Sequence, residues 1–186
     1  MKIIEWREFV KKGLQQEEKY SSMTVGVFDG VHRGHQALIK RIVSHNDSYA
    51  PVIITFRENH KTGTGERKDI QNFQDRLLMF EKLGVQITVA ADLNGEFRRM
   101  PGIEFLEIIL NHGRIGFFAA GSDFRCGCKL DTDAAVIKNF FASRNIPAEI
   151  VPQVMEGSLP VSSSRIREAL MSGNDALAQK MLGNSI

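Results

Sequence analysis

GVFDGVHRGH, residues 26–35, joins two segments of different periodicity. MTVGVF (23–28) is an apolar run of strand length, and in GHQALIKRIVS (34–44) the apolar residues recur at helical spacing. The stretch is therefore predicted to be a turn from a buried strand into a helix. Its glycines at 26, 30 and 34 allow a ligand to approach the backbone closely. The first N–H groups of such a helix attract anions.

The order of strand and then helix repeats along the rest of the chain. Further strands are predicted at 51–56, 86–91, 115–121 and 148–152, and helices at 70–84, 101–113 and 131–145, with two short helices between 163 and 183. The apolar face of the helix at 70–84 is expected to consist of Phe73, Leu77, Leu78 and Phe80, and Asp131 is expected to cap the helix at 131–145. This order predicts an α/β fold, a Rossmann-like doubly wound sheet of about five parallel strands.

Ligands bind such sheets at the carboxyl ends of the strands. A ligand is therefore expected at the loops that follow residues 28, 56, 91, 121 and 152. The polar segment RENHKTGTGERKD (57–69) is expected to form a mobile loop at the same edge.

Composition limits the class of protein and its partners. The 186 residues fit one domain, and the net charge of +2 gives no reason to expect a nucleic-acid or membrane partner. Two cysteines, Cys126 and Cys128, are too few for a disulfide framework and favour a reducing compartment. The N-terminus has no signal-peptide core, and no apolar run reaches the roughly 18 residues of a membrane span. We therefore expect a cytoplasmic protein.

Two of the five histidines, His32 and His35, lie three residues apart in the turn and can face the same side of the first helical turn. Two imidazoles beside unpaired N–H groups suit a phosphate that gains charge during a reaction. A metal site is disfavoured, because the other histidines and the Cys126-x-Cys128 spacing show no supporting pattern. The dinucleotide fingerprint and the P-loop are both absent.

A second phosphate-binding element is predicted in VSSSRIREAL, residues 161–170, just after the last predicted strand. One serine can cap the helix, while the others offer hydroxyls beside its N–H groups. Arg165 and Arg167 lie near that helix start, where cations oppose the helix dipole, so an anion is expected to offset them. By itself this segment also fits an ordinary capped helix. Together with the histidine turn it predicts a triphosphate site.

These two stretches resemble the HxGH nucleotidyltransferase superfamily. Within it the chain most resembles the FMN adenylyltransferase (FAD synthetase) module of bacterial bifunctional riboflavin kinase/FAD synthetases. Three more stretches carry the narrower resemblance: IITFRENH (53–60), GSDFRCG (121–127) and GNDALAQKMLG (173–183). The resemblance covers residues 23–183, with the motifs in the same order.

The resemblance implies a role for each matching residue. His32, His35 and Arg167 would be catalytic. The ATP-binding positions would be Gly26, Phe28, Asp29, Gly34, Ser163, Ser164 and Arg165. Flavin and cleft positions would be Phe56, Asn59, Asp123, Phe124 and Arg125. The substrates would be ATP, with Mg²⁺, and FMN, and the product FAD; no protein metal site is expected.

The chain also departs from the family pattern. Arg57 and Glu58 replace a usual Asp-Pro, His60 replaces a proline, and Cys126 stands where an aromatic residue is common. The bifunctional members continue into a riboflavin kinase domain. Residues 1–186 are instead expected to form a single nucleotidyltransferase domain with a small helical segment at about 163–183 and no kinase domain.

The sequence is also compatible with two alternative functions. One is another HxGH enzyme, a cytidylyltransferase or a pantetheine-phosphate adenylyltransferase. The cytidylyl branch usually carries R-T-x-G-I-S-T-T, whereas this chain reads GSLPVSSSRIR (157–167). The other is an inactive protein that binds flavin or nucleotide, for which the departures after Phe56 and Phe124 are the only support.

Overall fold

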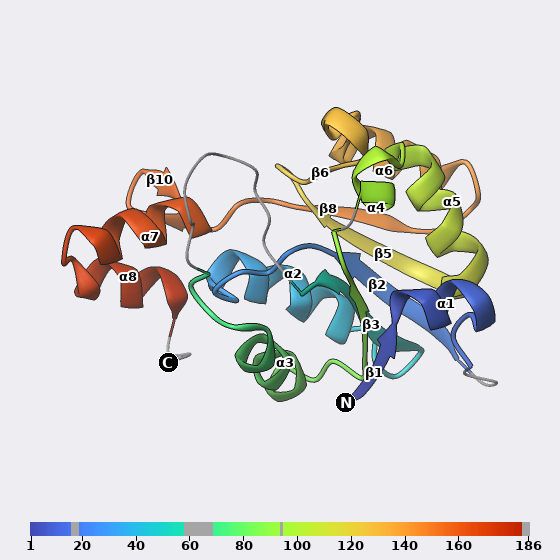
Figure 1. Cartoon of the computed structure of the whole chain (residues 1–186), viewed down its shortest axis with the longest axis horizontal. Coiled ribbons are helices and arrows are strands. Elements are labelled where there is room, and N and C mark those ends of the chain that lie inside the picture. Colours follow the sequence, from blue (N-terminus) through green and yellow to red (C-terminus); the bar gives the residue numbers. More distant parts are fainter. Residues whose placement is uncertain (16–18, 58–68, 94, 184–186) are drawn as a thin grey trace.

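The structure is a computed structural model that describes residues 1–15, 19–57, 69–93 and 95–183. A central parallel sheet is covered by helices on both faces (Figure 1). Its strands are β1 (Lys2–Glu5), β2 (Tyr20–Val25), β3 (Tyr49–Phe56), β4 (Ile87–Ala91), β5 (Ile115–Gly121) and β8 (Ala148–Val151), in the order β1-β4-β3-β2-β5-β8. Every neighbouring pair is parallel.

The helices are α1 (Trp6–Lys12), α2 (Arg33–Val43), α3 (Phe73–Lys82), α4 (Gly95–Arg99), α5 (Gly102–Gly113), α6 (Ala134–Ala142), α7 (Ser163–Met171) and α8 (Asp175–Leu182). Two short antiparallel pairs, β6 (Arg125–Cys126) with β7 (Thr132–Asp133) and β9 (Met155–Glu156) with β10 (Leu159–Pro160), lie in the connections, together with a 3₁₀ turn, η1 (Cys128–Leu130). No helix in the described ranges is both long and apolar enough to cross a membrane.

The predicted doubly wound parallel sheet is confirmed, and it has six strands rather than about five. The additional strand is β1, which pairs with β4 at the edge of the sheet from Lys2↔Ile87 to Glu5↔Ala90. Only Ile4 of β1 is buried, and the other three residues are exposed. A strand this short with one buried side chain gives almost no periodic signal, so the sequence analysis did not find it.

Successive side chains of each strand point to opposite faces of the sheet, so a hydrophobic core forms on each face. On one face Met23, Val25 and Phe118 pack with the apolar sides of α1, α5 and α6. On the other face Ile53, Phe117 and Ala119 pack with α2 and α3. A third, smaller cluster joins α7 to α8 through residues such as Ile166, Ala178 and Met181. In Figure 1 these two helices lie at one end of the sheet, beyond the start of α2.

Two details of the predicted helices are wrong. Leu78 of α3 is 50% exposed, whereas Arg76, which the predicted face did not include, is only 1% exposed. The cap of α6 is Asp133, whose Oδ1 accepts hydrogen bonds from the backbone N–H groups of Ala135 and Val136. Asp131 instead accepts from the N–H of Gly102, the first residue of α5. The carboxylate therefore joins two distant segments, which helical periodicity cannot reveal.

Candidate active site

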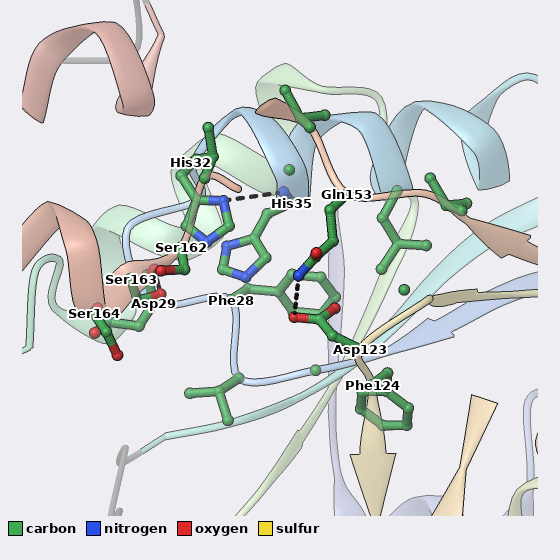
Figure 2. A pocket seen from close by; sticks show the side chains of 18 of the residues that line it. Phe28, Asp29, His32, His35, Asp123, Phe124, Gln153, Ser162, Ser163 and Ser164 are labelled. Carbon is green, nitrogen blue, oxygen red and sulfur yellow. Dashed lines mark hydrogen bonds between the residues drawn. The ribbon is translucent and has the colours of Figure 1, made fainter. Parts of the chain in front are cut away.

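A cleft of about 320 Å³ opens at the carboxyl ends of β2, β5 and β8, where the fold rule places ligands. It is bounded by the turn after β2, by the starts of α2 and α7, and by the loops after β5 and β8 (Figure 2). Twelve of the residues predicted for the site line it: Gly26, Phe28, Asp29, His32, Gly34, His35, Asp123, Phe124, Arg125, Ser163, Ser164 and Arg167. Segments more than 120 residues apart in the sequence thus meet in one cavity.

The two histidines stack at the start of α2, with ring centroids 3.6 Å apart and planes 17° from parallel (Figure 2). His32 is the N-cap: its Nδ1 accepts from the backbone N–H of His35 at 3.3 Å. Because Nδ1 accepts this hydrogen bond, the neutral ring carries its proton on Nε2. Gly34 lies beneath the ring, and a Cβ there would come within 3.2 Å of it. His32 is therefore held as a hydrogen-bond donor in a fixed orientation.

Burial also sets the charge of His32, which is 5% exposed. Removal from water lowers the pKa of His32 to about 4, although the carboxylates of Asp123 and Asp29 act in the opposite direction. The imidazole is therefore neutral at pH 7 when the cleft holds no anion. A phosphate beside the ring would favour the charged form and raise this pKa.

The turn before α2 has an unusual backbone. Phe28 and Val31 have φ angles of 55° and 35°, in a region that side chains other than glycine rarely occupy, and Gly30 has φ 83°. Burial holds this conformation: Phe28 and Val31 are 2% and 0% exposed, and the Phe28 ring packs edge-on against His35 with centroids 5.2 Å apart. Non-glycine residues in this region concentrate at functional sites.

Asp29 ties the turn to two other segments. Its carboxylate forms an ion pair with Arg167 of α7, with side-chain exposures of 3% and 15%. The other carboxylate oxygen accepts from the N–H groups of Ile70 and Gln71, at 2.9 and 3.3 Å. Ser163 donates to the backbone carbonyl of Asp29 at 2.9 Å. The start of α7 is thus fastened beside the histidines, and the guanidinium of Arg167 borders the cleft.

Three predicted residues do not line this cleft. The Arg165 guanidinium donates to the carbonyls of Leu159 and Pro160, at 2.9 and 2.7 Å, and so braces the β9–β10 hairpin. Phe56 lines a second cavity beside the first. Asn59, with the departures at Glu58 and His60, lies outside the described residues.

The second cavity has a volume of about 440 Å³ and shares a wall with the cleft. The shared residues are Val25, Gly26, Val27, Phe124 and Arg125. Its other walls are largely aromatic and aliphatic, and they include Phe56, Leu93, Phe97, Met100 and Phe105. Arg98 and Lys129 also line it. A flat aromatic ligand with an anionic group matches this lining.

Two polar residues of the cleft were not among the predicted site residues, although one of the three serines at 162–164 was expected to cap the helix. Ser162 is the N-cap of α7, and its Oγ accepts from the N–H of Arg165 at 3.3 Å. Gln153 donates from Nε2 to Asp123 at 3.1 Å, across the cleft from the serines (Figure 2). Gln153 follows the end of β8, so the rule about strand ends could have found it. A single glutamine in a loop carries no motif of its own.

Comparison with known families agrees with this geometry. The family model for FAD synthetase matches residues 14–165. The chain belongs to the FAD synthetase family. This result confirms the resemblance found in the histidine turn and the serine-rich helix. The matched range contains all the predicted site residues except Arg167.

One curated relative shows how much of this FAD synthetase family member is similar in sequence to a longer protein. The bifunctional riboflavin kinase/FMN adenylyltransferase of Escherichia coli K12 is 26% identical over 169 residues, which cover 87% of this chain and 54% of that protein. The chain therefore spans about half the length of this relative.

Solved structures support the fold. A macrolide-efflux protein from Streptococcus pneumoniae superposes with a TM-score of 0.83 at 27% identity, over 98% of this chain and 60% of its own. A pantoate-beta-alanine ligase from Francisella tularensis gives a TM-score of 0.60 at 15% identity, over 98% of this chain and 78% of its own.

Proposed function

We propose that this chain is an FMN adenylyltransferase, which transfers AMP from ATP to FMN and releases FAD and pyrophosphate. The observation that carries the proposal is the convergence of His32 and His35 with the serines and Arg167 at the start of α7 in one cleft. Family membership supports the same activity. The bifunctional relative from Escherichia coli K12, of which this chain covers 54%, also carries FMN adenylyltransferase in its name.

The chemistry follows from the donors around the cleft. The FMN phosphate attacks the α-phosphorus of ATP in line, the bond from that phosphorus to the bridging oxygen breaks, and pyrophosphate leaves with the bond electrons. No covalent enzyme intermediate is needed, because positioning and charge stabilisation suffice for phosphoryl chemistry. His32 and His35 stabilise the charge at the α-phosphorus. Ser163, Ser164 and Arg167 hold the departing β- and γ-phosphates.

The second cavity supports FMN as the acceptor. The isoalloxazine ring is flat and aromatic, and Phe56, Phe97 and Phe105 offer it an apolar surface. Arg125 lies on the wall common to both cavities, so its guanidinium can accompany the flavin phosphate into the cleft. A flavin in the second cavity would thus direct its phosphate toward ATP in the first.

Magnesium fits this site as a companion of the triphosphate. Among the described residues no group of three or more His, Cys, Asp or Glu side chains could hold a metal ion. The cleft does offer the exposed carboxylate of Asp123. Mg²⁺ commonly binds through one carboxylate, water and substrate phosphates, and it neutralises charge on the phosphate oxygens. We propose that the Asp123 carboxylate would help to hold Mg²⁺ together with the triphosphate.

The direct test is to incubate the protein with ATP, Mg²⁺ and FMN and to separate the flavins. We expect FAD and pyrophosphate in equal amounts. His35→Ala should lower turnover at least about a hundredfold, because a donor to the transition-state charge is lost. His112→Ala is the matched control, since His112 lies on α5 and lines neither cavity.

Parallel reactions with CTP or phosphopantetheine distinguish the alternative activities. FMN bound without product would identify a binding protein. Turnover of a folded His35→Ala variant at the unaltered rate would remove the histidines from the mechanism.

A further inference from the structure

Arg76 is a buried cation that the proposed mechanism does not use. It extends from α3 and is among the largest fully buried side chains, with 1% of its surface exposed. Its guanidinium lies 5.3 Å from the ring centroid of Phe73. In the part of the chain that the structure describes, this guanidinium forms no ion pair. A buried charge is costly unless hydrogen bonds satisfy it. The contacts of this side chain therefore indicate why an arginine is present.

Within the described residues, the side chain of Arg76 makes three hydrogen bonds, all to backbone carbonyls at the ends of two adjacent strands. Nη1 donates to Val27 at 2.6 Å and to Phe56 at 2.9 Å, and Nη2 donates to Arg57 at 2.7 Å. The β2–β3 ladder ends at Val25↔Ile54, followed by one bond from the Gly26 N–H to Ile54. Beyond that point the guanidinium takes the place of the ladder and links two strand ends that no longer pair with each other.

Two of the three residues that supply these carbonyls line the cavities. Val27 lines both cavities, Phe56 lines the second, and Val27 immediately precedes the strained residue Phe28 that packs against His35. Burial lowers the pKa of Arg76, while the nearby carboxylates Asp29 and Asp69 act in the opposite direction. A leucine or methionine of similar size would fill the same space but leave three carbonyls without this donor. The arginine therefore fixes the backbone between the cavities.

We propose that Arg76 is a positioning residue for adenylyl transfer. By holding the ends of β2 and β3 together, it sets the flavin bound in the second cavity relative to the ATP bound in the first, without touching either substrate. This inference rests on the proposed function. A group that aligns two bound substrates acts on the transfer step more than on the binding of either one. It should therefore change kcat and leave the two affinities nearly unchanged.

Arg76→Lys tests this inference, because lysine keeps the charge but cannot donate to three carbonyls in a fixed fork. We expect kcat to fall at least tenfold, while the dissociation constants of FMN and of a non-hydrolysable ATP analogue change less than threefold. Assays run well below the melting temperature of the variant, so that lost stability alone leaves kcat unaltered. Arg144→Lys is the matched control. Arg144 also donates to a carbonyl, that of Phe140, and lies over a phenylalanine ring, but it lines neither cavity.

Thr55→Val provides a second variant if Arg76→Lys does not fold. The Thr55 hydroxyl donates to the same Val27 carbonyl at 3.2 Å, and its removal leaves no buried charge. We expect a two- to fivefold fall in kcat with unchanged affinities. An unaltered chain that makes no FAD overturns the proposed function and this inference with it. An active chain whose Arg76→Lys variant keeps its kcat, or loses only affinity, overturns the inference alone. If Arg76→Lys is unfolded and Thr55→Val keeps its kcat, the inference also fails.

Discussion

His32 combines two roles that depend on its neutral ring. It caps α2 through Nδ1, and it presents its other nitrogen as a donor in the cleft. Both roles require burial, and burial opposes protonation. The burial that orients this side chain in the cleft therefore also makes the fold sensitive to acid.

The pH dependence of stability follows with a definite sign. Above pH 6.5 the ring is neutral in the folded and the unfolded chain, so it contributes no pH dependence. Below pH 6.5 the unfolded chain binds a proton that the folded chain refuses until about pH 4, so stability falls as pH falls through this window. His32→Asn keeps a capping side chain without the titration. We expect this variant to lose about 2 to 3 kcal/mol less stability than the unaltered chain between pH 7 and pH 4.

Urea unfolding of both proteins across this pH range measures the difference. Parallel stability curves for the two proteins would show that His32 is not held neutral by the fold.

The ion pair between Asp29 and Arg167 differs from the surface pairs of the molecule in its burial. Asp29→Asn removes the carboxylate charge from a largely buried ion pair, and we expect a loss of roughly 3 kcal/mol in the free energy of unfolding. Glu149→Gln removes the partner of Arg41, and these side chains are 36% and 45% exposed. That control should cost less than about 1 kcal/mol. Equal losses in the two variants, measured by urea unfolding, would contradict the role given to Asp29.

At the scale of elements, the start of α5 packs against the loop that walls the second cavity. Asp131 accepts from the N–H of Gly102, and the N–H of Cys128 donates to the carbonyl of Met100 at 2.9 Å. Gly127, with φ 83°, lies directly against Gly102. The loop from β6 to β7 is thereby held in place although its strands have two residues each.

Gly102→Ala tests this packing. The added Cβ would lie 2.2 Å from Oγ1 and 2.4 Å from Cβ of Thr132, which is 1% exposed and has no room to move. We expect a loss of about 3 kcal/mol in thermal or urea unfolding, with weaker FMN binding because the cavity wall shifts. Gly95→Ala is the matched control at the first residue of α4, where the added Cβ meets only Arg99, at 3.9 Å. Its stability should be unchanged or slightly higher. A tolerated Gly102→Ala would mean that the loop and α5 are not firmly packed.

At the scale of the whole molecule, α7 and α8 share an apolar cluster, against which Ile70 and Val154 from outside the two helices also pack. Polar contacts add further links to the rest of the fold. Gln36 of α2 donates from Nε2 to the carbonyls of both Val31 and Leu182, at 2.9 Å each. Arg33 forms an ion pair with Glu156. A nucleotide in the cleft would bridge these two parts, since its phosphates would contact α2 and α7 together.

We therefore expect a non-hydrolysable ATP analogue with Mg²⁺ to slow amide hydrogen exchange in α2, α7 and α8 together, with little change in α6. At a hundredfold excess over its dissociation constant it should add about 2.7 kcal/mol of stability, a rise of roughly 5 to 10 °C in Tm. Hydrogen-exchange mass spectrometry and a melting curve check both points. Protection confined to α2 would argue against a triphosphate that reaches α7.

Much of the fold was predictable because each buried strand is a short run of consecutive apolar residues, which can be recognised in the sequence. The apolar runs that became β2 to β5 and β8 were found, with ends displaced by a few residues: β2 ends at Val25, whereas the run was predicted to reach residue 28. The difference has a physical cause, because Gly26 begins to leave the sheet and Phe28 turns with positive φ. Hydrophobicity continues through the turn, since Phe28 is buried beneath the cleft rather than in a strand.

By itself the sequence determined the α/β class, the family and the residues that gather at the carboxyl ends of the strands. It could do so because the glycines, histidines and serines at those turns form motifs only a few residues long. Only the tertiary structure decided how these residues interact. Asp29 pairs with Arg167, Arg165 braces a hairpin, and Arg76 lies in the core. Each of these contacts joins a charged side chain to a group that becomes its neighbour only after folding. Local periodicity contains no information about such partners, and burial decides which of them a charge requires.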